Sequence, residues 1–401
     1  MNYSKEEVMQ YVAEEDVKFI RLAFCDVFGN QKNISIMPEE LERAFAHGIA
    51  FDASAIKGFG DEAHSDLFLH PEPDTLTPLP WRPEHGRVVR MFCNITYPDG
   101  TPFECDTRTL LKNAIREAEA AGYTFYFGAE QEFYLFELDE NNEKTDKPYD
   151  RAGYMDIAPA DRGENIRREI CLTLEQMGIR PESSHHEEGP GQNEIDFRYS
   201  GALNAADNAL TFQTVVRTVA RRNGLYADFS PKPIEGKPGN GFHINLSVMS
   251  EKEADFSGMI AGMLNRVAEI TAFLNPTEDS YRRLGQQKAP GYISWSRENR
   301  SQLVRIPAAA GEYRRAELRS PDPTANPYLA FALLIYAGLE GIQAKVKLPD
   351  PADINLFKAD AKTLAKFRKL PDNLTTAKEK ARNSAFVQAH IPASVLEIFC
   401  K

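Results

Sequence analysis

Residues 125–138, FYFGAEQEFYLFEL, place charged and apolar side chains at alternating positions, as in a half-buried strand. Side chains two positions apart on a strand point to the same side of a sheet. Glu130 and Glu132 therefore share one side, and Phe133 and Leu135 share the other. The stretch predicts a strand that packs apolar side chains into a core and gathers two carboxylates on its opposite face.

A second strand of this kind is predicted behind a turn. In residues 184–197, SHHEEGPGQNEIDF, a Gly-Pro-Gly turn separates Glu187 from Glu194. Glu194 then shares a face with Gln192 and Asp196. The two adjacent histidines before the turn are open to two interpretations, as packing residues or as ligands.

Two further segments place polar side chains on one face in the same way. The first is residues 239–248, GNGFHINLSV, and the second is residues 313–321, YRRAELRSP. The polar side chains that share a face are His243, Asn245 and Ser247 in the first segment and Arg315, Glu317 and Arg319 in the second.

Two interpretations of these four polar faces compete. One is the solvated outer face of an antiparallel sheet, which is a common arrangement. The other is a cation site, since carboxylates with one imidazole suit Mg²⁺ or Mn²⁺. We favour the cation site, because carboxylates gathered on one face repel one another unless a cation neutralises them. Neighbouring arginines indicate a phosphorylated ligand, although the chain has no GxxxxGK[ST] loop and no kinase HRD or DFG motif.

The composition excludes several other classes of protein. The chain has 401 residues, and 47 Lys and Arg against 59 Asp and Glu give a net charge of −12. This acidic balance argues against a nucleic-acid or anionic-membrane partner. Five cysteines without a CxxC pair, and an N-terminus without an apolar signal segment, indicate the cytoplasm. The longest apolar run, residues 328–339, is shorter than a membrane span of about 20 residues and predicts a buried helix that begins at Asn326.

The length of the chain predicts two domains, and we place them at residues 1–103 and 104–401. A Gly-Asn pair at residues 29–30 predicts a hairpin, and residues 51–85 are expected to be mainly loop. A strand is expected over residues 87–97. The expected helices cover residues 5–14, 38–46, 107–122, 165–177 and 206–223.

At these motifs the sequence resembles glutamine synthetase, type I, in its shorter bacterial form. The segments that carry the resemblance occur in order along nearly the whole chain. They include FIRLAFCDVFG, FDASAIKGF, GAEQEFYLFELDE, HHEEGPGQNEIDFRY, PKPIEGKPGNGFHINLS, SWSRENRSQLVRIP and ELRSPDPTANPYLAFALL. The resemblance implies an α+β fold, with an N-terminal β-grasp domain and a larger α/β catalytic domain built on an antiparallel sheet.

The resemblance also implies an activity and an assembly. The reaction would join ammonia to the γ-carboxylate of glutamate through γ-glutamyl phosphate, with ATP as a substrate and two or three Mg²⁺ or Mn²⁺ ions per active site. The homo-oligomer would consist of six-membered rings with active sites between subunits. Asp52 would reach the neighbouring subunit's site and help to deprotonate ammonium.

The resemblance further implies a role for each motif residue. One metal would be held by Glu132, Glu187 and Glu194, and a second by Glu130, His243 and Glu317. Glutamate would be held by Arg283 and Arg319, with Gly239 and His243 beside it. The nucleotide would be held by Glu182, Asn245, Ser247, Arg300, Arg305 and Arg315. Asp52, Arg283 and Arg319 are the residues that we expect to be catalytic.

One departure from the family pattern leaves the function open. Residues 285–290 read GQQKAP, and Lys288 stands where the family carries a glutamate that closes the ammonium site. A cation there would repel ammonium, so a ligase that uses another amine is an alternative. A non-catalytic relative that binds nucleotide and glutamine as a regulator is a third interpretation.

Overall fold

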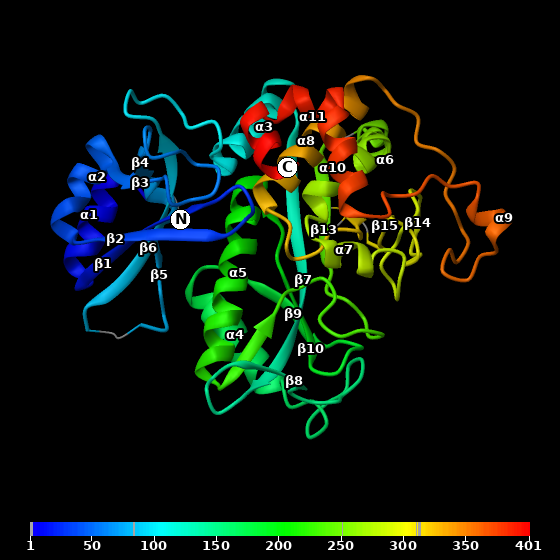
Figure 1. Cartoon of the computed structure of the whole chain (residues 1–401), viewed down its shortest axis with the longest axis horizontal. Helices are drawn as coiled ribbons and strands as arrows, with labels where there is room; N and C mark the ends of the chain where they lie inside the picture. Colours follow the sequence, from blue (N-terminus) through cyan, green and yellow to red (C-terminus); the bar gives the residue numbers. More distant parts are fainter. Residues whose placement is uncertain (1–2, 83–84, 251, 310, 312–313) are drawn as a thin grey trace.

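The computed structural model divides the chain into two sheets with helices packed against them (Figure 1). It describes residues 3–82, 85–250, 252–309, 311 and 314–401. The N-terminal sheet, drawn in blue, lies beside a larger part that contains the rest of the chain. Sheets and helices are mixed in both parts, so the predicted α+β class is confirmed.

Within the described residues, six strands form the N-terminal sheet in the order β2-β1-β6-β4-β3, with β5 beside β6. The central pair β1 and β6 is parallel and the other pairs are antiparallel. The strands are β1 (Val17–Cys25), β2 (Gln31–Ile36), β3 (Ile49–Asp52), β4 (Asp66–Pro71), β5 (Thr77–Pro78) and β6 (Arg87–Thr96). The helices are α1 (Lys5–Glu14), η1 (Pro38–Glu40), α2 (Leu41–His47) and η2 (Pro73–Thr75).

The predicted hairpin is confirmed, since β1 and β2 pair on either side of a tight turn. The Asp26 carboxylate accepts hydrogen bonds from the backbone N–H groups of Phe28 (3.0 Å) and Asn30 (2.9 Å), and Gly29 has φ +87°. The loop expected over residues 51–85 is wrong in part, because β4 lies inside it. Its apolar residues are consecutive, so the sequence lacks the alternation that marks a half-buried strand.

Ten strands of the described part form the second sheet, in the order β14-β15-β16-β13-β7-β10-β9, with β8, β11 and β12 also paired to β7. The long central strand β7 is flanked by β13 and β10, and both pairs are antiparallel. The strands are β7 (Thr124–Leu138), β8 (Lys144–Pro148), β9 (Pro181–His186), β10 (Gln192–Phe197), β11 (Ser200–Gly201), β12 (Leu225–Asp228), β13 (Phe242–Met249), β14 (Trp295–Arg297), β15 (Val304–Ile306) and β16 (Ala316–Leu318).

Helices cover the apolar face of this sheet and leave its polar face open. The helices predicted over residues 107–122, 165–177 and 206–223 are confirmed as the first three of the series. The series is α3 (Thr107–Ala120), α4 (Glu164–Gln176), α5 (Ala202–Arg222), α6 (Glu253–Leu274), α7 (Glu278–Arg283), α8 (Pro327–Gln343), α9 (Ala361–Leu364), α10 (Leu374–Asn383), α11 (Ala385–His390) and α12 (Ala393–Phe399).

The predicted buried helix is α8, which begins where the Asn326 side chain accepts a hydrogen bond from the Tyr328 backbone N–H. Its Phe331 ring stacks on Phe127 of β7 with 4.3 Å between ring centroids. Its contact with α6 is backbone to backbone, because a Cβ added at Gly341 would lie 2.1 Å from the Gly258 carbonyl oxygen. Among the described residues, no helix has both the length and the apolar character needed to cross a membrane.

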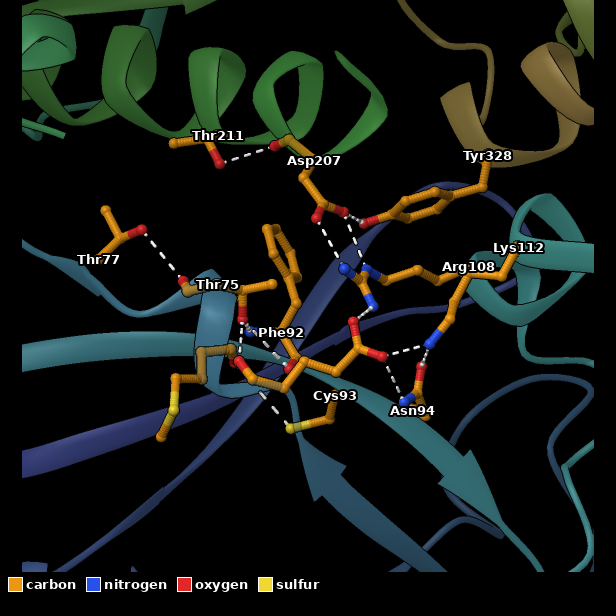
Figure 2. A network of polar contacts seen from close by, with 12 residues as sticks. Thr75, Thr77, Phe92, Cys93, Asn94, Arg108, Lys112, Asp207, Thr211 and Tyr328 are labelled. Carbon is orange, nitrogen blue, oxygen red and sulfur yellow. Dashed lines mark hydrogen bonds and ion pairs between the residues drawn. The ribbon is translucent and has the colours of Figure 1, made fainter. Parts of the chain in front are cut away.

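A buried polar network joins the two parts of the chain (Figure 2). The Arg108 guanidinium, at the start of α3, donates to both carboxylate oxygens of Asp207 on α5, at 3.0 and 2.9 Å. It also pairs with Glu72, which precedes η2 and is shared with Lys112. Tyr328 donates to Asp207 at 2.6 Å. This network fixes the N-terminal sheet against the helices behind the second sheet.

Candidate active site

The four polar faces predicted from the sequence meet on one side of the second sheet. In the antiparallel register, Glu130 on β7 lies opposite Asp196 on β10 and His243 on β13. Glu194 lies opposite the second carboxylate of β7, and Glu317 on β16 lies opposite an asparagine of β13. Because side chains paired across antiparallel strands point to the same face, these donors come together above one sheet surface.

One group of donors consists of Glu130, His243 and Glu317, whose ligand atoms all lie within 4.8 Å of one another. His243 Nδ1 is 3.3 Å from a Glu130 oxygen and 3.7 Å from a Glu317 oxygen. Burial favours the neutral form of Glu317, but the charges of Arg319, His243 and Arg305 outweigh it and hold the pKa of Glu317 at about 2. This carboxylate is therefore ionised at neutral pH although it is almost fully buried.

A second group consists of His185, Glu187 and Glu194, again within 4.8 Å of one another. His185 Nε2 is 3.0 Å from a Glu187 oxygen and 3.9 Å from a Glu194 oxygen. The family resemblance grouped Glu132, rather than His185, with Glu187 and Glu194. Within the described residues Glu132 belongs to no such group, and its Oε2 accepts hydrogen bonds from the Gly241 backbone N–H (2.8 Å) and the Gln192 amide (3.2 Å).

The carboxylates of this face are crowded, and their ionisation reflects it. Burial, together with the charges of Asp196, Glu132 and Glu130, raises the pKa of Glu194 well above its usual range. Burial and the charge of Glu130 also raise the pKa of Asp196 to about 6. Such a set of oxygen donors with imidazoles at its edge fits a hard divalent cation, which would replace the protons that these shifts indicate.

Buried arginines stand next to the carboxylates. Arg283, on α7, is 3% exposed and donates to the Ser320 carbonyl oxygen at 2.7 Å, while Arg319 pairs with Glu317. Burial lowers the pKa of Arg283. Gly239 lies against Arg283, and a Cβ added at this glycine would lie 2.3 Å from the Pro231 carbonyl oxygen. The same Cβ would lie 2.9 Å from Arg283 Cγ, so only glycine fits between Pro231 and this arginine.

These side chains, apart from the buried Glu317, line a cavity of about 670 Å³. The residues named from the sequence that line it are Glu130, Glu132, Glu187, Glu194, Gly239, His243, Arg283, Arg300, Arg305, Arg315 and Arg319. Glutamate, imidazole and guanidinium groups thus face one space. Such a space suits an anionic ligand held between cations and arginines.

An adjoining cavity of about 100 Å³ collects the other predicted nucleotide residues, Glu182, Asn245 and Ser247. It shares Glu130, Asp196 and Arg315 with the first cavity. Asn245 links Glu130 to Arg315, since its amide donates to Glu130 at 2.7 Å and its oxygen accepts from Arg315 Nε at 2.9 Å. The two spaces are therefore neighbours that share these polar side chains as a boundary.

Asp52 is the one predicted site residue that lies apart from the others. It ends β3 in the N-terminal sheet, away from β7 and β10 (Figure 1), and it does not line either cavity in the described part of this chain. Hydrogen bonds from the Ser54 hydroxyl (2.6 Å) and backbone N–H (2.9 Å) lower the pKa of this exposed carboxyl.

Lys288 is neutralised at the rim of the larger cavity. Its ammonium lies 2.5 Å from a Glu188 carboxylate oxygen and 5.5 Å from the centre of the Tyr154 ring. The loop that carries it is tied down at Gln287, whose amide donates to the Gly236 carbonyl oxygen at 2.7 Å. The positive charge of Lys288, which the sequence suggested would repel ammonium, is thus paired with the negative charge of Glu188.

Sequence reasoning missed several residues of this site. Asp196 and Gln192 share the polar face of Glu194, so the strand pattern already marked them, but no role followed from it. His185 was left open between packing and binding, and its contacts with two carboxylates place it among the donors. Tyr154 lies in an irregular segment, where no periodicity indicates the direction of a side chain.

The fold and this site define a class of protein, namely one in which a mainly antiparallel sheet gathers acidic donor groups and arginines on one face. The comparisons with known proteins agree. Residues 16–98 match the family model for the glutamine synthetase beta-Grasp domain, and residues 104–401 match that for the glutamine synthetase catalytic domain. The chain belongs to the glutamine synthetase family.

Individual relatives cover most of the chain. A glutamine synthetase from Clostridium saccharobutylicum is 46% identical over 369 residues, which are 88% of this chain and 83% of the relative. One from Methanosarcina mazei is 44% identical over 401 residues, or 96% of this chain and 90% of the relative. A solved structure described as the GmaS/ADP complex in conformation 1 has a TM-score of 0.89 at 27% identity, covering 100% of this chain and 94% of that one.

Proposed function

We propose that this protein ligates ammonia to the γ-carboxylate of L-glutamate, using ATP and passing through γ-glutamyl phosphate. Glutamate, ammonia and ATP are the substrates of the family, which also uses divalent metals. The observation that supports this most strongly is the convergence of Glu130, His243 and Glu317 beside a second donor group. Both groups lie at a cavity that is also lined by buried arginines, although Glu317 itself does not line it.

The donor groups suit two Mg²⁺ or Mn²⁺ ions, with one held by Glu130, His243 and Glu317. Glu187 and Glu194 would hold the other, with Glu132 and His185 beside them. A third group of donors, which joins Glu130 and Glu194 to Asp196, fits a further ion between the two. When bound, such ions neutralise charge on a transferred phosphoryl group and align its attacker and leaving group.

The arginines divide the cavity between the two anionic substrates. Arg283, beside Gly239, and Arg319 are both buried and would hold the carboxylates of glutamate, since guanidinium pairs with carboxylate in a bidentate manner. Arg300, Arg305 and Arg315, which line the same cavity and are less buried, would bind the phosphates of ATP. The rest of the nucleotide would occupy the adjoining cavity, whose residues are Glu182, Asn245 and Ser247.

The assembly that we propose is a homo-oligomer of six-membered rings, in which Asp52 completes the site of the next subunit. An ionised carboxylate favours the binding of NH₄⁺ and can then accept a proton from it. The low pKa of Asp52 keeps it ionised at neutral pH. We place the division between domains at residue 103 and the protein in the cytoplasm, in line with five cysteines that are all free thiols in the described part of the chain.

Ammonia is favoured over another amine because the argument for a different amine rested on the charge of Lys288. That charge is balanced by Glu188. A purely regulatory relative is disfavoured for a different reason. The site has both donor groups and the arginines that line the cavity. A protein that only bound nucleotide and glutamine as a regulator would not need carboxylates crowded together in this way.

Product analysis tests the proposal. The purified protein is incubated with ATP, Mg²⁺, glutamate and one amine at a time, namely ammonia, methylamine or ethylamine. We expect equal amounts of glutamine, ADP and phosphate with ammonia, and a much lower rate with either alkylamine. A higher kcat/KM with an alkylamine would establish the other ligase activity, and the absence of ADP with every amine would establish the regulator. Native mass spectrometry of the same sample measures the number of subunits.

A further inference from the structure

A cavity of about 920 Å³ lies at the junction of the two parts of the chain. Its lining includes residues of η2, β5 and β6 on the N-terminal side and of α3, α4, α5, β7 and α8 in the larger part. Figure 2 shows the polar network beside it. None of the described residues that we assign to glutamate, nucleotide or metal lines this cavity, so it is separate from the active site.

The cavity contains a buried cation, Arg90 on β6, which is only 7% exposed. Its Nη1 donates to the Thr211 hydroxyl at 2.7 Å and its Nη2 to the Thr77 hydroxyl at 3.4 Å, while the Phe92 ring lies 4.0 Å from the guanidinium carbon. Among the described residues, no carboxylate oxygen lies within 4.0 Å of Arg90, and its Nε–H has no hydrogen-bond partner.

The carboxylates of the neighbouring network are already engaged (Figure 2). Asp207 accepts both hydrogen bonds from Arg108 and a third from Tyr328. Glu72 is shared between Arg108 and Lys112. Burial lowers the pKa of Arg90 to about 10, so the side chain is still charged at neutral pH. The charge of Asp207 acts on Arg90 from beyond ion-pair distance, but Asp207 is already bound by Arg108 and Tyr328. A buried guanidinium with no carboxylate in direct contact is costly, and an anion that entered the cavity would offset that cost.

The other lining residues restrict the kind of anion. Phe125, Met177 and Ile335 give the cavity an apolar wall. Its exposed lining includes three acids, Asp74, Glu119 and Glu175, which disfavour a ligand that carries several negative charges. A single negative charge on an apolar body matches both features.

We propose that this interdomain cavity binds a small monocarboxylate with an apolar body, and that its carboxylate is held by Arg90. Such a ligand contacts the N-terminal sheet and the helices of the larger part at the same time. Its binding therefore stabilises the junction between them, because a ligand that binds only the folded state raises its stability.

Calorimetric titration of the full-length protein with acetate, butyrate and hexanoate tests the proposal, with hexanamide and inorganic phosphate as comparison ligands. We expect saturable binding that strengthens along the series of acids, at least tenfold weaker binding of hexanamide, and a higher melting temperature with hexanoate. Equal binding of acid and amide, tighter binding of phosphate than of hexanoate, or no saturable binding of any acid would overturn the proposal.

Two variants and a control locate the site. Arg90→Met removes the cation and is expected to weaken hexanoate binding at least tenfold, whereas Arg43→Met, an exposed arginine on α2, should leave it unchanged. Leu203→Trp puts a bulkier side chain on the cavity wall while keeping Arg90, and it should also abolish binding. If Arg90→Met does not fold, the Leu203→Trp variant still tests whether hexanoate binds in this cavity. Full hexanoate affinity in a folded Leu203→Trp protein would exclude this cavity, whatever the enzyme's activity.

Discussion

Glu194 on β10 lies directly opposite Glu132 on β7 in the antiparallel register, so two carboxylates face each other across one strand pair. Burial raises the pKa of both side chains, and each lies near further acids. Like charges that are paired across strands destabilise a sheet unless a cation or a proton lies between them. We therefore expect the crowded carboxylates to lower the stability of the metal-free protein and a bound cation to restore it.

Removing one of these carboxylates is expected to weaken metal binding without lowering the stability of the metal-free protein. In Glu194→Gln, the melting temperature of the protein in EDTA should stay the same or rise, because a neutral amide replaces a crowded acid. The stabilisation gained on adding Mg²⁺ or Mn²⁺ should fall to less than half, against about 2.7 kcal/mol expected for wild type at a hundredfold excess over Kd.

Thermal melts with and without metal measure both effects. Glu140→Gln, in the exposed turn after β7, is the matched control and should behave like wild type. An unchanged metal response in Glu194→Gln would show that this carboxylate is not a ligand.

The stability of the junction between the two parts should depend on pH through Glu72. Burial raises the pKa of this side chain, but Arg108 and Lys112 outweigh it and hold the pKa at about 2, below the ordinary 4.5. Because the folded-state pKa is depressed, the stabilisation is complete above about pH 4.5 and is lost as the pH falls towards 2. Glu72→Gln should thus cost roughly 2–3 kcal/mol at pH 7, and about half as much at pH 3.

Urea denaturation at the two pH values measures this difference. Glu42→Gln, an exposed glutamate on α2, serves as the control for loss of a carboxylate. A difference that is the same at both pH values would contradict the role of ionised Glu72.

The polar faces of the site were predictable because a strand has a period of two residues. That period alone placed Glu130 with Glu132 on one strand, and His243 with Asn245 on another. Which side chains meet across strands was not predictable in the same way. The register that sets Glu130 opposite His243 depends on how the whole sheet assembles, and family resemblance supplied that grouping instead.

Contacts made by irregular segments were beyond sequence reasoning for a different reason. Lys288 and Glu188 are 100 residues apart, and both lie outside regular strands and helices. The buried link from Glu72 through Arg108 to Asp207 is likewise long-range, and nothing in the local pattern distinguishes these charges from solvated ones. Periodicity assigns side chains to faces, but it carries no information on which distant partners they find.

The pair of Lys288 and Glu188 is expected to protect ammonium binding rather than to select another amine. Both side chains are well exposed, at 51% and 39%, so losing the pair should cost less than about 1 kcal/mol of stability. Glu188→Gln leaves the lysine charge unbalanced and should raise the KM for ammonia by about two- to fivefold. The double variant Glu188→Gln/Lys288→Met should restore it.

Steady-state kinetics with ammonia and methylamine test this interpretation. In Lys288→Met, the ratio of kcat/KM for the two amines should stay within about threefold of wild type, since a balanced charge exerts little net field. A shift of more than tenfold towards methylamine would instead identify Lys288 as the residue that selects the amine.

Asp52 offers a test of the ring arrangement, because it lies apart from the cavity that its own chain forms. Asp52→Ala and Glu317→Gln should each be nearly inactive alone. If every site combines Asp52 of one subunit with Glu317 of the next, co-expression of the two variants produces some sites with both native residues. A head-to-tail ring assembled at random from equal amounts should regain roughly a quarter of wild-type activity. Activity no greater than the sum of the separate variants would place Asp52 in its own chain's site or outside the reaction.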